Sequence, residues 1–335
     1  MPGSAPARRS STGTARTDSP PTNAISARRR EMSTVPLKPL PPGMDNPHYE
    51  FSPFHKRPKL VWPGQARIAF FVTLHLEYWE LLPPADAHRD PRFVGEYGTF
   101  TPDYRTWTQR EYGNRVGIFR VLEVLDRHRL KAGVAVNELA AARYPYLIEQ
   151  FRRRGYEFIA HGTSANRMIT SKMDEAAEKA TISGAIDAVE KATGARPTGW
   201  MGQDYGESHR TPKLLAEAGL DYVLDWPNDD QPYAMNVGRP FVSLPNQPEW
   251  DDVQQLWLRR IDMPRYPDLV AEAFDYLHGE GGQVFNLSLH PWLIGMGHRI
   301  KYLDEALRRI GRHAHVWHTT PGEVARHYRQ VAMPD

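Results

Sequence analysis

Short apolar runs alternate with longer amphipathic segments from Ala66 onward, and this alternation constrains the fold more than any other feature. Short apolar runs predict buried strands, whereas apolar residues at every third or fourth position predict helices. The predicted strands cover residues 67–75, 132–136, 157–160, 197–200, 222–224, 241–244, 284–289 and 315–317. The predicted helices cover residues 115–129, 146–154, 174–193, 212–218, 265–280, 299–311 and 321–328. This succession is typical of an α/β protein with a parallel sheet.

The number of these elements favours a barrel-like arrangement over an open sheet. Residues 66–330 are about as long as one (β/α) barrel, so we expect a single domain with a distorted (β/α) barrel fold. In such a barrel the residues that perform chemistry lie at the carboxyl ends of the strands. Polar residues that directly follow the predicted strands are therefore the candidates for a functional site.

The segment before the barrel has a different composition. Residues 1–40 are rich in Ser, Thr, Pro, Ala and Arg and contain no aromatic residue. Such a segment cannot bury enough apolar surface to offset the entropy of ordering, so we predict a disordered tail. Either Met1 or Met32 fits as its first residue. Residues 41–65 are rich in proline, which predicts an extended arm lying over the barrel.

Composition excludes several functional classes. The chain has no Cys, so thiolate metal sites, iron–sulfur clusters and cysteine nucleophiles are excluded. Seven basic residues lie in segment 1–40 against Asp18 and Glu31, which leaves the rest of the chain slightly acidic and argues against a nucleic-acid partner. The longest apolar stretch, 68–74, is too short to cross a bilayer, so no membrane partner is expected. We expect a cytoplasmic protein that acts on a small molecule.

The first predicted strand ends in an unusual pair of polar residues. Side chains alternate along a strand, so His75 and Glu77 point to the same side. An imidazole and a carboxylate on one face at the end of a buried strand form a candidate catalytic pair. A His and a Glu that simply meet solvent at the end of the strand would give the same pattern.

Two further predicted strands are each followed directly by a histidine. His161 follows the strand at 157–160 and is itself followed by Gly162, which allows a close approach of the backbone. His290 follows the strand at 284–289 and is fixed by the proline after it. Each of them could be a structural histidine, but three strands that all end in histidine favour one shared site.

Loops after other strands contribute candidate binding residues. Trp200, Gln203 and Asp204 follow the strand at 197–200, in a loop whose glycines would let the backbone approach a ligand. Asp229 and Asp230 follow the strand at 222–224, although Asp and Asn between prolines are also typical of a solvated turn.

The order of these segments resembles the polysaccharide deacetylase (NodB-homology) superfamily, especially its branch of urate-catabolism allantoinases and cyclic imide hydrolases. The resemblance spans the chain from about Trp62 to Tyr328. It is carried by residues 62–69 (WPGQARIA), 156–162 (YEFIAHG), 196–200 (RPTGW), 228–233 (NDDQPY), 289–292 (LHPW) and 297–300 (GHRI). It implies a barrel of the NodB type, hydrolysis of carbon–nitrogen bonds and a homo-oligomer.

The metal ligands of the family are only partly present. Metal-dependent members have paired aspartates on the first strand and a His-x-x-x-His motif; here these places read His75-x-Glu77 and His161 followed by Ala165. Glu77 and His161 alone are too few for tightly bound zinc, which normally takes at least three protein ligands. Asn166, next to the lost position, would bind a metal weakly at best. The resemblance to the allantoinase branch therefore favours a site without a metal, and zinc stays open as a cofactor.

The sequence thus predicts a hydrolase of a small amide, ureide or cyclic imide. Glu77, with its pKa raised towards neutrality, is the expected base for the attacking water, oriented by His75. His161 is expected to hold the developing oxyanion, and His290 matches the family's general acid. The predicted substrate-binding residues are Asn166, Trp200, Gln203, Asp204, Asp229, Asp230 and Trp292. The alternatives are a metal-dependent N-deacetylase of an amino-sugar polymer and an inactive barrel that binds a sugar or ureide.

Overall fold

The structure is a computed structural model, and it describes residues 38, 40–41, 43–88, 90, 92 and 101–333. Almost all of the predicted tail at 1–40 lies outside these residues. The strands are β1 Ile68–Leu76, β2 Ala132–Val136, β3 Glu157–Ala160, β4 Gly199–Trp200, β5 Tyr222–Val223, β6 Tyr233–Ala234, β7 Val242–Ser243, β8 Gln283–Leu289 and β9 Val316–His318. The α-helices are α1 Tyr104–Tyr112, α2 Ile118–Arg127, α3 Glu138–Arg143, α4 Pro145–Arg153, α5 Glu175–Thr193, α6 Thr211–Glu217, α7 Tyr266–Glu280, α8 Pro291–Ile294, α9 Ile300–Ile310 and α10 Pro321–Ala332.

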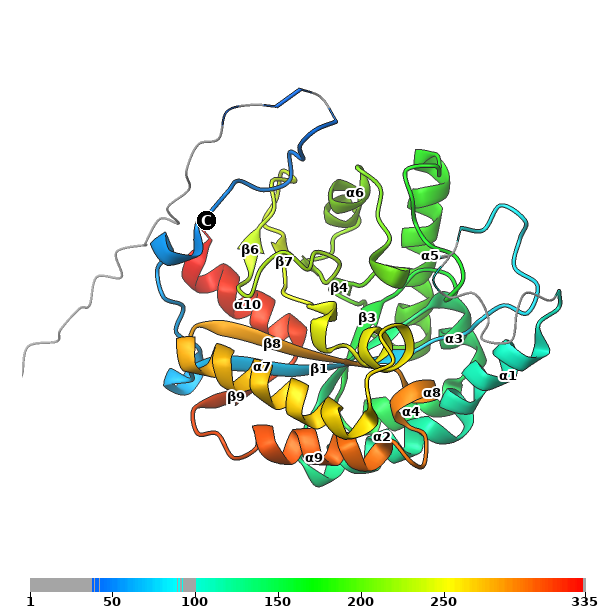
Figure 1. Cartoon of the computed structure of the whole chain (residues 1–335). Coiled ribbons are helices and arrows are strands. Elements are labelled where there is room, and N and C mark those ends of the chain that lie inside the picture. Colours follow the sequence, from blue (N-terminus) through cyan, green and yellow to red (C-terminus); the bar gives the residue numbers. More distant parts are fainter. Residues whose placement is uncertain are drawn as a thin grey trace, which may run out of the picture.

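One mixed sheet organises the chain into a half-barrel with helices packed around it (Figure 1). Its strand order is β6-β7-β5-β4-β3-β2-β1-β8, and β9 pairs with the first residues of β1. All described pairs are parallel except β6 with β7. The predicted distorted α/β barrel is confirmed. The short strand β6, which the sequence analysis missed, has too few residues to show a periodic pattern.

Strand β1 lies inside the protein, and its two faces contribute to different cores. Ile68, Phe70 and Val72 pack in the cluster that includes residues of α2, α7 and α9. Ala69 and Phe71, on the other face, belong to the cluster that includes inward-facing residues of β2, β3 and β7. Because both faces are covered, all nine residues of β1 are buried.

The helix predicted at 115–129 begins earlier, because helical backbone runs from α1 through a π-helical turn at Gly113–Gly117 into α2. Two glycines explain the close packing there. A Cβ on Gly113 would lie 2.5 Å from the backbone nitrogen of Trp292, and one on Gly117 would lie 2.1 Å from the carbonyl oxygen of Pro291. Helix α8 can therefore rest directly on this turn, which fixes the backbone that follows His290.

The arm at 41–65 contains only short 3₁₀ turns where it is described, and Trp62 anchors its end. The Trp62 side chain is 1% exposed, and its indole N–H donates to the carbonyl of Gln283 at the start of β8. Arg57 forms an ion pair of 2.6 Å with Asp229. Among the described residues, no helix combines the length and apolar character needed to cross a bilayer.

Candidate active site

The carboxyl ends of β1, β3 and β8 meet around one cavity of about 50 Å³. Glu77, His161 and His290 all line it, as expected for residues that follow neighbouring strands of a barrel. The lining residues are His75, Glu77, Arg92, His161, Met201, Asp204, Tyr205, Pro248, Asp251, Val253, Gln254, Leu258 and His290. Side chains that are separated by 84 positions in the sequence, or by as many as 213, are thus brought into contact.

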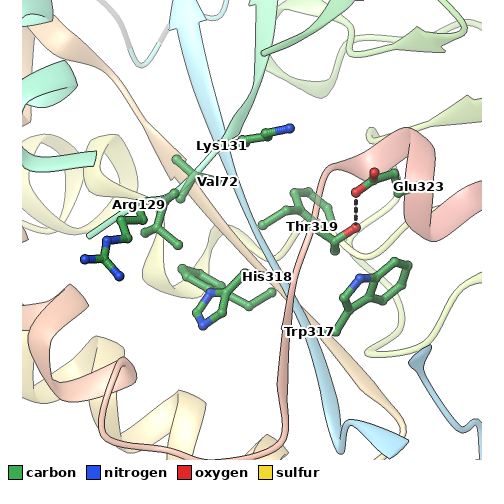
Figure 2. Close-up of a pocket in the computed structure, with 10 residues that line it drawn as sticks. Val72, Arg129, Lys131, Trp317, His318, Thr319 and Glu323 are labelled. Carbon is green, nitrogen blue, oxygen red and sulfur yellow. Dashed lines mark hydrogen bonds between the residues drawn. The ribbon is translucent and has the colours of Figure 1, made fainter. Parts of the chain in front are cut away.

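A larger cavity, of about 280 Å³, lies away from these histidines (Figure 2). It opens where β9 ends and β2 begins, since both strands pair with the same edge of β1. Arg129 and Lys131 line it at the amino end of β2, opposite to the end at which the candidate site lies. None of the predicted site residues lines this cavity.

His290 is held by Asp252 on the segment after β7. Its Nδ1 donates to Oδ1 of Asp252 at 2.7 Å, and its backbone N–H donates to Oδ2 of the same carboxylate at 2.8 Å. Burial lowers the pKa of His290, but the carboxylates of Asp252 and Asp251 outweigh it and raise the pKa to about 9. His290 is therefore a cation at neutral pH, as a general acid must be.

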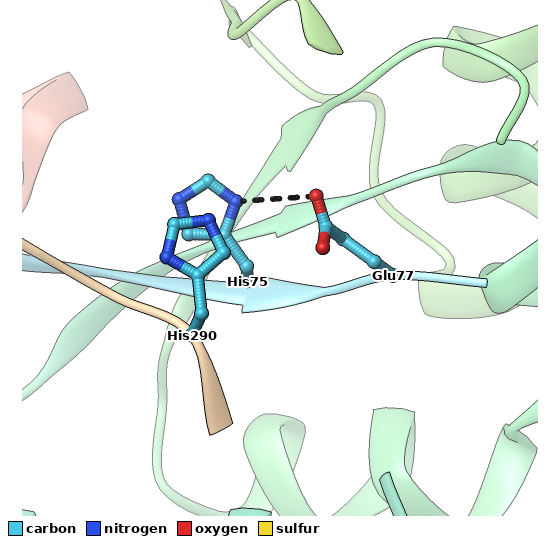
Figure 3. A group of neighbouring side chains, drawn as sticks. All are labelled: His75, Glu77 and His290. Atoms are coloured by element: carbon cyan, nitrogen blue, oxygen red, sulfur yellow. Dashed lines mark ion pairs between the residues drawn. The ribbon is translucent and has the colours of Figure 1, made fainter. Parts of the chain in front are cut away.

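The His290 ring stacks on the His75 ring, with centroids 3.8 Å apart, and Glu77 lies beside them (Figure 3). His75 and His161 present one nitrogen each to the same oxygen of Glu77. Oε1 of Glu77 lies 3.3 Å from Nε2 of His161 and 3.8 Å from Nδ1 of His75. The two nitrogens are 3.4 Å apart. Three potential ligand atoms thus face one another.

The far nitrogens of the same two histidines have partners of their own. Nδ1 of His161 donates to the carbonyl of Met201, directly after β4. Nε2 of His75 lies 2.9 Å from the hydroxyl of Ser288 on β8, which in turn hydrogen-bonds Asp251. Each ring is therefore fixed from both sides.

Glu77, the residue expected to act as the base, has a lowered pKa and not the raised one that was predicted. Burial raises the pKa of Glu77, but hydrogen bonds with His161 and His75 outweigh it and hold the pKa well below its usual value. The expectation of a pKa near neutrality was wrong, because the two histidines stabilise the carboxylate. For His75, burial and then the charge of His290 lower the pKa to about 3, so this ring is neutral.

Asp204 is a carboxyl group of the cavity whose pKa lies near neutrality. Burial raises its pKa, the charges of Glu77 and Asp90 add to the effect, and the result is about 7. Its backbone is left-handed, with φ 50°, and the next residue, Tyr205, has φ 59°. Two consecutive non-glycine residues in this region store strain, which is frequent at functional sites.

The other predicted binding residues do not line the cavity. The Asn166 side chain bonds the backbone of Glu80, and Gln203 donates to the carbonyl of His161 at 2.8 Å. Trp200 is fully buried in a core cluster, and Trp292 packs against Arg110. Gln203 therefore positions a site residue, and no described contact gives these four a direct route to a ligand.

Asp229 and Asp230 also lie outside the cavity. Asp229 is paired with Arg57 of the arm, and the carbonyl of Asp230 accepts the N–H of Val284 in β8. The loop before β6, which contains both residues, therefore hydrogen-bonds to the outer edge of β8. The substrate contacts predicted for both residues stay without support in the geometry.

Asp251, Asp252 and Ser288 were not predicted from the sequence. Ser288 lies two positions before His290 on β8, so strand periodicity alone places both on one face. Asp251 and Asp252 follow β7 only after a 3₁₀ turn, Pro248–Trp250, and a single sequence offers no signal that links them to a histidine 38 positions away.

The donor set around Glu77 fits a divalent metal ion. Imidazole nitrogens and a carboxylate oxygen are the ligands zinc takes in catalytic sites. Only Glu77 and His161 were expected as ligands from the sequence, but the fold brings His75 to the same point. His75, Glu77 and His290 also form a compact group of possible ligands, but the Nδ1 of His290 is engaged by Asp252.

Comparison with known proteins identifies the domain. Residues 111–223 match the polysaccharide deacetylase family. A Schizosaccharomyces pombe protein named provisionally as a polysaccharide deacetylase is 24% identical over 299 residues, covering 79% of this chain and 91% of that protein.

Two crystal structures share the fold. One is a probable polysaccharide deacetylase from Pseudomonas aeruginosa PAO1, with a TM-score of 0.76, 25% identity and coverage of 84% of this chain and 97% of that one. The other is PuuE allantoinase, with a TM-score of 0.74, 26% identity and coverage of 83% and 95%. The chain therefore contains a segment that matches the polysaccharide deacetylase family, and it shares its fold with a probable polysaccharide deacetylase and an allantoinase.

Proposed function

We propose that this protein hydrolyses the carbon–nitrogen bond of a small amide, ureide or cyclic imide. The observation that carries the proposal is the cationic His290, held by Asp252 at the wall of a narrow cavity that also contains Asp204. An acid and a base on one small cavity are what amide hydrolysis requires. The likeness to PuuE allantoinase supports a ureide among the substrates.

His290 is the general acid in this proposal. Departure of nitrogen from a tetrahedral intermediate is slow unless the nitrogen is protonated. The Nδ1–H of His290 donates a hydrogen bond to Asp252. Nε2 is therefore the atom from which a proton passes to the leaving group. Asp252 orients the ring and stabilises its charged form, as a buried carboxylate does for a catalytic histidine.

Asp204 is the general base in place of Glu77. A base works best when its pKa lies near the working pH, because it is then both ionised and basic enough to accept a proton. Asp204 meets this condition, with its pKa raised to about 7 by burial. Glu77 stays ionised but is too weak a base, since its pKa is held low by His161 and His75.

His161 is not suited to the oxyanion role expected of it. Its Nδ1 donates to the carbonyl of Met201, and its Nε2 is engaged by Oε1 of Glu77 at 3.3 Å, so neither ring nitrogen is left to donate to an oxyanion. His75, Glu77 and His161 are instead the residues that would hold a metal ion. When bound, such an ion would polarise the scissile carbonyl of the substrate.

The size of the cavity supports a small substrate. A space of about 50 Å³, walled by buried side chains of several strands, suits the functional group of a small planar molecule. A polymer chain would need an open groove on both sides of the reacting bond.

The second candidate is a metal-dependent N-deacetylase of an amino-sugar polymer. It is favoured by the three convergent ligand atoms of His75, Glu77 and His161 and by the family match. An inactive barrel that binds a ureide or sugar is the third possibility, and the same assay addresses it.

A panel assay tests these candidates. Allantoin, cyclic imides and acetylated amino-sugar oligomers are incubated with the full chain, with and without added zinc. Turnover of the small substrates is expected, whereas turnover of the oligomers alone would establish the deacetylase. Binding of a small ligand without turnover of any compound would contradict the proposal and establish the inactive barrel.

A further inference from the structure

We propose that the side-chain hydroxyl of Tyr205 donates a hydrogen bond to the carbonyl oxygen of the bond that is cleaved, and holds this oxygen more strongly as negative charge develops on it. The inference rests on the proposed function, because it names the group that performs the role for which His161 is not suited. Tyr205 lines the cavity together with Asp204 and His290. It directly follows the proposed base in the chain.

The hydroxyl of Tyr205 is a buried donor that the chain itself does not use. Among the described residues, no group forms a hydrogen bond with it. Burying a polar group without a hydrogen bond costs free energy, so such a group in a folded protein requires an explanation. By contrast, the buried hydroxyl of Tyr222 donates to Glu157 at 2.7 Å. A substrate carbonyl that enters the cavity would supply the acceptor that Tyr205 lacks.

The Tyr205 hydroxyl keeps its proton at every pH at which the proposed base works. Burial, and then the charges of Asp251, Asp225 and Asp204, raise the pKa of Tyr205 well above its usual value. The phenol is therefore neutral throughout the range in which Asp204, with a pKa of about 7, ionises. A neutral O–H donates to a carbonyl oxygen, and the hydrogen bond strengthens when that oxygen becomes negative.

The loop after β4 holds Tyr205 in place. Backbone hydrogen bonds close this loop, from Tyr205 to the carbonyl of Gly202 at 3.3 Å and from Gly206 to the carbonyl of Gln203 at 2.8 Å. The N–H of Gly202 donates in turn to both oxygens of Asp225, at 2.7 Å and 2.9 Å. A donor that is already in position needs no reorganisation during the reaction, which is why such donors are effective.

The neighbouring positions of Asp204 and Tyr205 suit the first step of hydrolysis. The oxygen of a water molecule bonds to the carbonyl carbon, its proton passes to Asp204, and the electron pair of the C=O double bond moves to the oxygen held by Tyr205. Asp204 becomes neutral as this oxygen becomes negative, so the two do not repel each other. His290 then protonates the nitrogen while the C–N bond breaks and the double bond forms again.

The alternative is that Tyr205 only forms part of the cavity wall, as Val253 and Leu258 do. The ring would then matter and the hydroxyl would not. Tyr205→Phe separates these roles, because it removes one oxygen atom and keeps the ring. The change breaks no hydrogen bond among the described residues, so the variant should be at least as stable to denaturant as the wild type.

The test compares the steady-state kinetics of the full chain and of Tyr205→Phe with allantoin and with succinimide. We expect kcat to fall about 10²- to 10³-fold, the scale for loss of one oxyanion donor, with a much smaller change in KM. The acid limb of the kcat–pH profile should stay near pH 7, because the charge of Asp204 is untouched. An unchanged kcat, or a loss accompanied by a displaced acid limb, would overturn the inference.

Tyr222→Phe is the matched control, with the opposite expectations. Tyr222 lies on β5 outside the cavity, and its hydroxyl donates to Glu157. Its loss leaves that carboxyl group without a donor, so the free energy of unfolding should fall while kcat stays at the wild-type value. An equal loss of kcat in both variants would show that removing a buried hydroxyl acts through the fold, and would contradict the role of Tyr205.

The same measurements separate a failure of this inference from a failure of the proposed function. If the wild type hydrolyses the two compounds and Tyr205→Phe hydrolyses them equally fast, only the inference is wrong. If the wild type hydrolyses neither compound, the proposed function is wrong, and the role of Tyr205 is overturned with it.

Discussion

Asp252 engages His290 twice, accepting the ring Nδ1–H at 2.7 Å and the backbone N–H at 2.8 Å. The Asp252 side chain is fully buried, so this pair is shielded from competing water. The double contact fixes both the position of the ring and the location of its proton. It is the observation that best supports the proposed role of His290 as an acid.

Changing Asp252→Asn should therefore slow the reaction. Asn keeps the shape but removes the charge that stabilises the imidazolium, so kcat/KM should fall by about 10²-fold, the usual scale for loss of general acid catalysis. His290→Ala should affect amides with poor leaving groups most and activated anilides least. The measurement is kcat/KM across a leaving-group series, and equal losses along that series would contradict the role.

Asp204 should govern the acid side of the pH profile. Because burial raises its pKa to about 7, the base is lost to protonation as the pH falls below 7, and activity should fall with it. Asp204→Asn tolerates the same left-handed backbone and should reduce kcat by about 10²-fold. The comparison is the kcat–pH profile of both proteins from pH 5 to 9. An unchanged acid limb in the variant would assign that limb to another group.

Asp304 on α9 should contribute stability that depends on pH far from the site. Burial raises its pKa, but hydrogen bonds from Arg127, His128 and Arg308 outweigh it and lower the pKa to about 2. A carboxyl with a lowered folded-state pKa stabilises the fold above its unfolded value, and this stability is lost as the pH falls towards 2.

Asp304→Asn should therefore cost about 1–2 kcal/mol of unfolding free energy at pH 6, after allowance for solvent screening, and almost nothing near pH 2. Denaturant unfolding of both proteins at several pH values measures this difference. A constant difference across the range would show that packing, not charge, explains the loss.

The tail and the arm should differ sharply in their effect on stability. Deleting residues 1–31 should leave the melting temperature and activity unchanged, because this segment has little that could pack. Trp62→Ala should cost about 3 kcal/mol or more, because it empties a buried site and leaves the carbonyl of Gln283 without its donor. Thermal melts of both variants provide the comparison, and a loss of several degrees on deleting the tail would show that it docks.

The sequence alone was sufficient to predict the barrel and to place the candidate site at the ends of its strands. Short apolar runs located β1, β2 and β3 to within a residue, because a strand that is covered on both faces leaves a continuous apolar run in the sequence. The same pattern located the histidines, because His161 and His290 directly follow their strands. Local spacing also placed His75 and Glu77 on one face.

Only the tertiary structure decided what these residues can do. The direction of the pKa shift of Glu77 depends on His161, 84 positions away, and the charge of His290 depends on Asp252, 38 positions away. The role of His75 depends on the register that places Ser288 beside it. Proton affinities and ligand sets arise from burial and from neighbours distant in the chain, and no local pattern records either.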